Sequence, residues 1–251
     1  MEMPLETASA ASPHKRSAVQ VRVEELPWHD LRQSLWTSGY AVTPPVLTAG
    51  ECVELRNLYS RDELFRSQIV MERLRFGRGD YKYFANPLPE IVRELRTYAY
   101  PHLAVVANEW NAALGNPSKF PAEHAAFLEH CHRAGQKRPT PLLLHYEQDG
   151  YNCLHQDIYG AVAFPLQVVF MLGQQGRNWQ GGEFVLVEQR PRAQSKVEVI
   201  SPDEGCAIIF TTRYRPVQGS KGYYRVNIKH GVARVRSGSR YTLGIIFHDA
   251  E

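Results

Sequence analysis

Residues 142–157 have the sequence LLLHYEQDGYNCLHQD, in which two strand-like segments flank a turn. Apolar and aromatic residues favour strands on both sides, and Asp149-Gly150 is a typical turn pair. Residues two apart on a strand point to the same face of the sheet. His155 and Asp157 can therefore present an imidazole and a carboxylate to one metal ion. This stretch predicts a β-sheet that carries a metal site.

The second half of the chain continues this pattern of short strands separated by turns. Eight segments rich in Val, Ile, Phe and Tyr are predicted as strands: 142–147, 153–158, 165–172, 183–188, 196–200, 206–211, 225–235 and 240–247. Such a series of short strands indicates a sandwich or jelly roll. We expect a double-stranded β-helix, which is a jelly roll, over about residues 141–249.

The first half of the chain is predicted to be mainly helical and to pack on one sheet of the roll. Thr48 and Glu51 have the spacing of a capping box that would start a helix over residues 52–59. Further helices are predicted at 28–36, 91–114 and 120–131, with the second of these interrupted or restarted at Pro101. We expect an α+β protein composed of a mobile tail (1–20), a mainly helical region (21–138) and a jelly-roll core (139–251) that forms one unit with the helices.

The composition favours a packed globular protein. Hydrophobic residues make up 43% of the chain and charged residues 22%, and no apolar run approaches the ~20 residues that span a bilayer. The first residues lack the apolar centre of a targeting signal. The four cysteines form no CxxC pair, which argues against a zinc ribbon or a disulfide framework. We expect a cytoplasmic protein with no membrane partner, and nothing here indicates its oligomeric state.

A third metal ligand must come from elsewhere in the chain, and His230 is the best candidate. It follows the strand-like residues Val226-Asn227-Ile228-Lys229. Two histidines and one carboxylate form the facial triad of non-haem Fe(II) oxygenases, which leaves coordination positions open for a cosubstrate and oxygen. The alternative for a His-x-Asp pair alone is a core histidine followed by a turn residue.

Arg240 lies ten residues after His230 on the next predicted strand, and Thr242 shares its face. An Arg and a hydroxyl so placed can bind a carboxylate through charge-assisted hydrogen bonds. Tyr146, nine residues before His155, can add a phenolic donor from the preceding strand. A surface Arg opposite an acid is the alternative for Arg240. For the whole roll, a cupin-like metal-binding module without turnover is the alternative.

With these residues the chain resembles the Fe(II)- and 2-oxoglutarate-dependent dioxygenase superfamily. Gly181-Gly182-Glu183 also matches a segment of its prolyl-hydroxylase-like members. The resemblance implies Fe(II) held by His155, Asp157 and His230. It also implies 2-oxoglutarate bound by Arg240, Thr242 and Tyr146, and O2 as the oxidant. Residues 145–157 and 234–238 further resemble a bacterial family described as an oxygenase acting on damaged DNA.

The substrate prediction rests on charge and aromatic residues. The net charge is only +3, yet residues 190–240 hold eleven basic and three acidic residues. Residues 73–84 interleave basic with aromatic side chains, which suits phosphate contact and base stacking. The substrate candidates there are Arg75, Arg78, Tyr81 and Lys82. A flexible lid or a plain irregular connection is the alternative for this segment.

These features predict a DNA or RNA partner and oxidative demethylation of an alkylated base. One departure from the repair-enzyme pattern stands against this prediction. Leu144 occupies the position where AlkB-type enzymes carry an Asn. Hydroxylation of a protein side chain or a small metabolite is the alternative activity.

Overall fold

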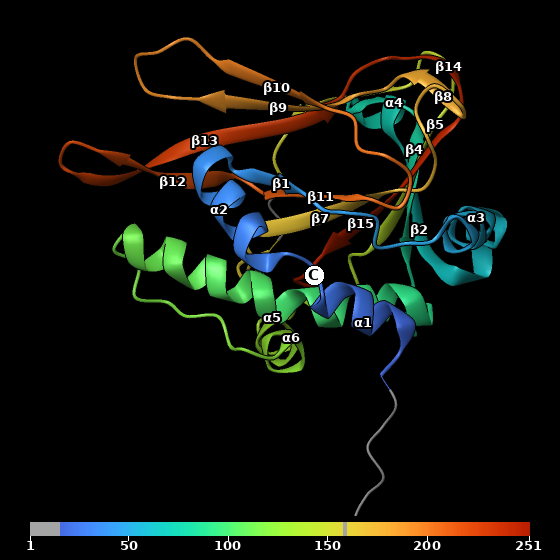
Figure 1. Ribbon diagram of the computed structural model, residues 1–251. Helices are drawn as coiled ribbons and strands as arrows, with labels where there is room; N and C mark the ends of the chain where they lie inside the picture. The colour runs from blue at the N-terminus through green and yellow to red at the C-terminus, as the bar shows by residue number, and fades with distance from the viewer. Residues whose placement is uncertain (1–15, 158–159) are drawn as a thin grey trace, which may run out of the picture.

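The computed structural model describes residues 16–157 and 160–251 and shows two antiparallel β-sheets with helices on one side (Figure 1). The larger sheet is seven-stranded, in the order β1 (Tyr40–Val42), β11 (Ala207–Thr211), β7 (Leu166–Met171), β15 (Arg240–Ile246), β5 (Leu142–Tyr146), β4 (Asp80–Phe84) and β2 (Phe65–Val70). The smaller sheet has the order β10 (Lys196–Ile200), β9 (Phe184–Gln189), β13 (Gly222–Val232), β6 (Tyr151–His155) and β3 (Gly77–Arg78), and β12 (Tyr214–Gly219) pairs with β13. A third sheet pairs β8 (Trp179–Gly181) with β14 (Val235–Gly238).

Two hydrophobic cores hold these layers together. Between the two sheets, Val169 and Phe210 from the larger sheet pack with Phe184 and Ile228 from the smaller one. A second core joins the helices to the other face of the larger sheet and includes residues from both halves of the chain. Side chains of alternating strand residues thus fill both interfaces. The α+β class predicted from the sequence is confirmed.

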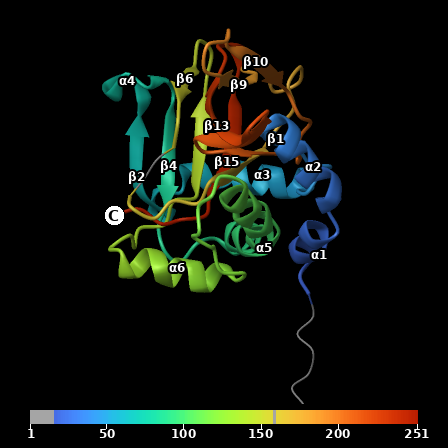
Figure 2. The same cartoon turned by 90° about the vertical axis from the view of Figure 1, so that its left-hand side faces the viewer.

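The helices are α1 (Ala18–Glu24), α2 (Trp28–Ser38), α3 (Ala49–Asn57), the short α4 (Met71–Leu74), α5 (Glu90–Ala113) and α6 (His124–Arg133), with 3-10 turns η1 (Leu58–Ser60) and η2 (Asp62–Leu64). In Figure 2, α1, α5 and α6 lie below the strands, whereas α4 lies at the top. The capping box of Thr48 and Glu51 is present at the start of α3, as predicted. None of the helices in the described part of the chain is long and apolar enough to cross a membrane.

Helix α6 meets the sheet through a buried histidine. His124, which is 5% exposed, has its Nε2 atom 2.8 Å from the backbone carbonyl oxygen of Phe247. Burial lowers the pKa of His124 to about 3, because the charged imidazolium would lose its hydration. This histidine is therefore neutral in the folded protein at physiological pH.

Several predicted boundaries need correction. α5 continues through Pro101 without a break, and α6 begins at His124, four residues later than predicted. The predicted tail reaches residue 20, but Ser17 caps α1 and the helix begins at Ala18, while residues 1–15 lie outside the described residues. The largest difference is in residues 21–138, where β1, β2, β3 and β4 extend both sheets.

The segment 73–84 is therefore neither a lid nor an irregular connection. It contains the end of α4, then β3 paired with β6, and β4 inserted between β5 and β2. In the second half, the predicted strand 153–158 ends at His155, so Asp157 lies just beyond the strand. The predicted strand 225–235 divides into β13 and β14.

Candidate metal and cosubstrate site

The structure brings His155, Asp157 and His230 together between the two sheets. One ligand atom from each lies within 4.8 Å of the others. β6 and β13 supply the histidines, whose positions are paired directly across the antiparallel strands. The Nε2 atom of His230 is 3.1 Å from Asp157 Oδ2, and that of His155 is 3.6 Å from Asp157 Oδ1. Both imidazoles therefore turn the same nitrogen toward the carboxylate.

The hydrogen bond on the far side of His155 fixes its tautomer. Its Nδ1 atom lies 2.8 Å from the carbonyl oxygen of Cys153, which can only accept a hydrogen bond. Nδ1 therefore carries the proton and Nε2 keeps its lone pair. Burial, and secondarily the charge of His230, lower the pKa of His155. Neutral imidazole with a fixed tautomer is the form that binds a metal ion.

Asp157 is held as a carboxylate. Burial by itself would raise its pKa, but the charge and hydrogen bond of His230 outweigh that effect and the net pKa lies below the usual range. Gln167 on β7 also donates a hydrogen bond from Nε2 to Asp157 Oδ2 at 2.8 Å. The sequence analysis did not identify Gln167. Its signal is a polar residue in the middle of an otherwise apolar strand.

Gln156, between the two ligands in sequence, turns away from them. Its Nε2 atom donates to the backbone carbonyl oxygens of Arg213 at 2.8 Å and Ile228 at 2.9 Å. This side chain therefore ties the ligand segment to the start of β12 and to β13. It was also absent from the predicted site.

Arg240 begins β15 and is only 2% exposed. Its Nε atom has no hydrogen-bond partner, and it makes no ion pair with any described residue. Among residues 16–157 and 160–251, its one polar contact within hydrogen-bond range is to Met171 Sδ, at 4.0 Å. The rings of Tyr146 and Trp179 lie 5.5 and 5.9 Å from its guanidinium carbon. A buried guanidinium without a carboxylate partner is costly unless a ligand supplies one.

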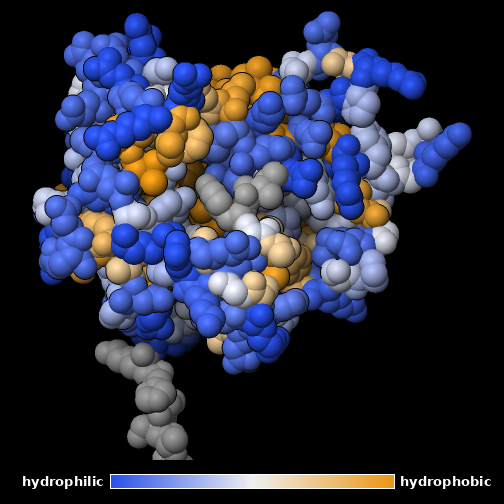
Figure 3. Space-filling view, turned by 180° about the vertical axis from the view of Figure 1, so that it is seen from behind, coloured by the Kyte–Doolittle hydropathy of each residue, from blue (hydrophilic) through white to orange (hydrophobic). Residues whose placement is uncertain are grey.

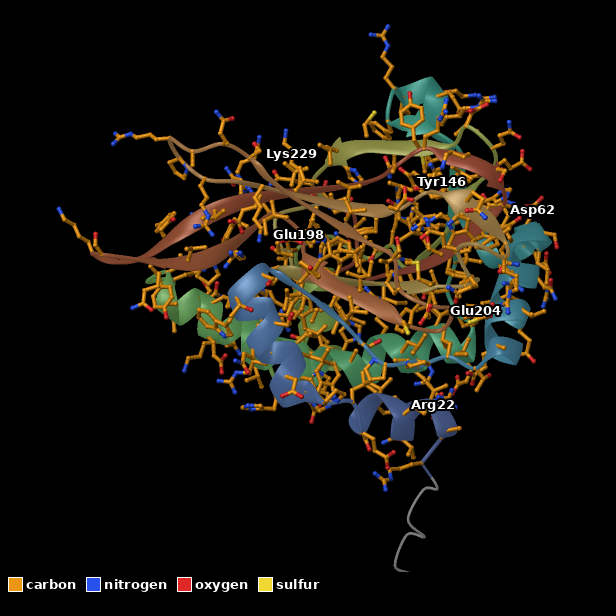
Figure 4. The ribbon with its side chains drawn as sticks, turned by 45° about the horizontal axis from the view of Figure 1, so that its top comes forward. Arg22, Asp62, Tyr146, Glu198, Glu204 and Lys229 are labelled. Atoms are coloured by element: carbon orange, nitrogen blue, oxygen red, sulfur yellow. The ribbon has the colours of Figure 1, made fainter. Side chains whose placement is uncertain are left out.

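A cavity of about 430 Å³ connects the two groups of residues. Its lining includes the three candidate ligands together with Arg240, Thr242 and Tyr146. Thr242 is 1% exposed and Tyr146 is fully buried. Asn152 donates to the Tyr146 hydroxyl at 3.4 Å. Figure 4 labels Tyr146 on β5, which is a strand of the larger sheet.

The position of Gly182 shows why a glycine is needed in the Gly-Gly-Glu segment. Its φ of +64° is in the left-handed region, and a Cβ atom there would lie 3.0 Å from Arg240 Cδ and 2.9 Å from Val235 Cγ2. Glycine thus allows the backbone to approach the Arg240 side chain. The motif packs against the stem of the arginine and restricts its position.

The four predicted substrate residues divide into two groups. Arg75 and Tyr81 line the cavity, together with Phe76 and Tyr83, which the prediction did not include. Arg78 is exposed, lies outside this cavity and is 3.9 Å from the carboxylates of Glu72 and Asp149.

The structure places Lys82 outside the cavity. Alternation along β4 turns its side chain away from the cavity, while Tyr81 and Tyr83 face it. Lys82 is 7% exposed and its Nζ atom is 2.7 Å from Asp62 Oδ1 and 2.9 Å from the Tyr59 carbonyl oxygen.

Comparison with known proteins identifies the family. Residues 79–250 match the model of the family Oxygenase-NA, described as "Oxygenase, catalysing oxidative methylation of damaged DNA". The chain belongs to this oxygenase family. The match covers most of both sheets and every residue of the candidate metal and cosubstrate site.

Two curated relatives are similar to this chain over most of its length. Two uncharacterized proteins of Mycobacterium tuberculosis, from the strains CDC 1551 / Oshkosh and H37Rv, are each 41% identical over 202 residues, which cover 80% of this chain and 84% of each relative. These relatives therefore match this oxygenase over most of their length.

Solved structures with a similar fold include two prolyl hydroxylases and an oxidoreductase of the 2OG-Fe(II) oxygenase family. A prolyl-4-hydroxylase of Pseudomonas putida is 15% identical with a TM-score of 0.53, over 89% of this chain and 99% of that one. A prolyl hydroxylase of Trichoplax adhaerens, solved with a hypoxia inducible factor peptide, is 17% identical with a TM-score of 0.54, over 92% of both chains. An oxidoreductase of the 2OG-Fe(II) oxygenase family from Burkholderia pseudomallei is 17% identical with a TM-score of 0.53, over 90% of this chain and 94% of that one. The predicted jelly-roll fold is confirmed.

Proposed function

We propose that this protein is an Fe(II)- and 2-oxoglutarate-dependent dioxygenase that oxidises an alkyl group on a damaged nucleic-acid base. One observation carries the cofactor part of the proposal. A His-Asp-His set suited to Fe(II) and a buried arginine without a carboxylate partner among the described residues line the same cavity. The donor set and the unpaired guanidinium fit the metal and the dicarboxylate, respectively.

Separate residues would hold the metal and the cosubstrate. Fe(II) and 2-oxoglutarate, when bound, couple decarboxylation of the cosubstrate to oxidation of a substrate C–H bond by O2. His155, Asp157 and His230 would hold the metal from one side. Arg240 and Thr242 would pair with the distal carboxylate of the cosubstrate.

Tyr146 would act as a hydrogen-bond donor to bound anions. Burial raises its pKa to about 12, so the phenol keeps its proton at neutral pH. Gln167 would keep the Asp157 carboxylate oriented, because its amide hydrogen bond holds one oxygen in place. These roles position and polarise groups without proton transfer by the protein.

The aromatic and basic residues that line the cavity support the proposal that the substrate is a nucleic-acid base. Tyr81 and Tyr83 line it with rings perpendicular to one another and 5.5 Å apart, which offers aromatic surface to a planar ring. Phe76 is 47% exposed and Arg75 is exposed beside it, so an aromatic group and a cation flank the opening. The description of the family, which names damaged DNA, supports the same choice.

The direct test supplies the protein with Fe(II), 2-oxoglutarate and single- or double-stranded DNA that carries N-methylated bases. Hydroxylation of an N-methyl carbon gives a hydroxymethyl group that leaves as formaldehyde. We expect succinate and formaldehyde to form in equal amounts, and Asp157→Ala to form neither. Succinate without formaldehyde from any alkylated strand would favour hydroxylation of a protein side chain or metabolite. No succinate at all would favour a binding module.

A further inference from the structure

Outside the site, the hairpin formed by β12 and β13 carries several basic residues and no acidic ones. We refer to residues 213–229 as the arm. It contains Arg213, Arg215, Lys221, Arg225 and Lys229, and no Asp or Glu. In Figure 1 the tip of the arm extends farther to the left than the helices, and the β9–β10 hairpin lies above it. A projecting element with one sign of charge attracts a partner of the opposite sign.

Only one of these cations has an acidic partner. Arg215 is buried and pairs with Glu188 at 2.7 Å. Arg213, Lys221 and Arg225 are exposed and Lys229 is half-buried, and none of these four forms an ion pair with a described residue. Arg225 instead lies over the ring of Tyr214, 4.8 Å from its centroid. Their charge is therefore available to an external anion.

Alternation along β13 places Arg225 and Lys229 on one face. Val226 and Ile228 are buried against the interior, whereas Arg225, Asn227 and Lys229 alternate with them and point outward. Tyr214 pairs with Asn227 across the hairpin and so shares the outward face. Figure 4 shows Lys229 on the side of the molecule away from the helices.

The arm begins at the candidate active site. Lys229 immediately precedes His230, and Gln156 binds the carbonyl oxygens of Arg213 and Ile228. At about 3.4 Å per residue, Arg225 lies roughly 14 Å from Lys229 along the strand, and Lys221, just before the strand begins, lies roughly 27 Å away. Such a row is longer than a nucleoside or small metabolite, but it matches the repeated phosphates of a strand.

We propose that the arm binds the phosphates of a nucleic-acid strand that extends from the cavity, through Arg213, Lys221, Arg225 and Lys229. This inference rests on the proposed function, because it takes the substrate to be a base within a polymer. In this proposal the arm contributes affinity for the nucleic-acid strand, and the cavity holds the base that is oxidised. An acidic protein is the competing partner, and the experiment separates the two.

The test compares Lys221→Gln/Arg225→Gln with Lys119→Gln/Lys137→Gln. Both double variants remove two exposed cations, but the second pair lies on loops that flank α6. Binding is measured by fluorescence anisotropy with a labelled single strand of about 20 nucleotides, longer than the ~4–16 that one module covers. If two phosphate contacts are lost, the slope of log affinity against log salt should fall in magnitude by about 1.4 in the arm variant, and the control should keep its slope.

Turnover on substrates of two lengths separates this inference from the proposed function. We expect the arm variant to lose about tenfold or more in kcat/KM on the long methylated strand and less than twofold on a methylated trinucleotide. An equal loss on both, or an unchanged salt slope, would overturn the arm as a phosphate-binding surface. So would a polyglutamate peptide that competes as well as DNA. Absence of turnover on every methylated strand, with the salt-slope difference intact, would refute the proposed chemistry and leave the arm supported.

Discussion

Replacing Arg240 with Met should stabilise the ligand-free protein and weaken 2-oxoglutarate binding at the same time. Arg240 is 2% exposed, and the described part of the chain offers its guanidinium only a 4.0 Å contact to Met171 Sδ and two aromatic rings beside it. Cation–π contacts contribute ~0.5–2 kcal/mol each, whereas burying a charge costs several kcal/mol. We therefore expect the free energy of unfolding to rise by roughly 1–3 kcal/mol.

Binding should change in the opposite direction. Truncating one partner of a buried, hydrogen-bonded charge pair costs ~2–5 kcal/mol, which corresponds to a roughly 30- to several-thousand-fold loss of 2-oxoglutarate affinity. Urea unfolding of the metal-free protein measures the first effect. Calorimetric titration of 2-oxoglutarate, with Mn(II) in place of Fe(II) and without oxygen, measures the second.

Arg215→Met is the matched control for this experiment. Arg215 is 4% exposed, but it pairs with Glu188 and donates to the Trp36 carbonyl oxygen at 3.0 Å. Its removal leaves Glu188 partly uncompensated and should destabilise the protein by about 3–5 kcal/mol. Its affinity for 2-oxoglutarate should stay within about twofold of wild type. If Arg240→Met instead destabilised the protein and bound 2-oxoglutarate normally, Arg240 would be a structural residue and the cosubstrate assignment would be refuted.

Three other changes test separate parts of the structure. Asp157→Ala should abolish iron-dependent succinate formation and the rise in melting temperature on adding Mn(II); turnover that persists would refute the ligand assignment. Gly182→Ala should raise the KM for 2-oxoglutarate, because its Cβ atom would press on Arg240 Cδ at 3.0 Å, while Gly176→Ala, with nothing within 4 Å, should only lose stability. Because the pKa of His124 is about 3 when folded and ~6.5 when unfolded, the unfolded chain takes up the proton first as the pH falls. Protonation of this histidine in the unfolded chain should therefore lower the free energy of unfolding by about 2 kcal/mol as the pH falls from 6.5 to 5. His124→Asn should make the free energy of unfolding, measured by urea titration, depend less on pH over this range.

The sequence predicted the strands of the roll well where burial is continuous. The prediction of 240–247 corresponds to β15 (Arg240–Ile246), and 206–211 to β11 (Ala207–Thr211). Both strands lie inside the larger sheet, so most of their residues are buried, and the runs 208–210 and 243–246 reveal them by local composition.

The strands near the N-terminus could not be predicted in this way. β2 and β4 contain polar and charged residues, and β4 depends on pairing with β5, about 60 residues later in the chain. Their partners are set by tertiary contacts that no local pattern encodes. Proline also misled the prediction, because α5 accommodates Pro101 within one continuous helix.

Spacing along the chain was informative for the site because the relevant residues lie at fixed positions on neighbouring strands. His155 and His230 are direct cross-strand partners, and Arg240 is paired with Tyr146 in the larger sheet. The residues that orient them were missed, since Gln156 and Gln167 have no distinguishing motif. Their roles follow from hydrogen bonds that only the folded chain creates.

The two hydrogen bonds of Gln156 mean that the arm and the metal-ligand segment cannot move independently. An outward displacement of either backbone carbonyl would pull on the residue between His155 and Asp157. Thermodynamic linkage is reciprocal, so if a nucleic-acid strand on the arm changes metal affinity through this amide, the metal changes the affinity for the strand by the same factor. Under the proposed function, a single uncharged amide would couple occupancy of the metal site to engagement of a long substrate.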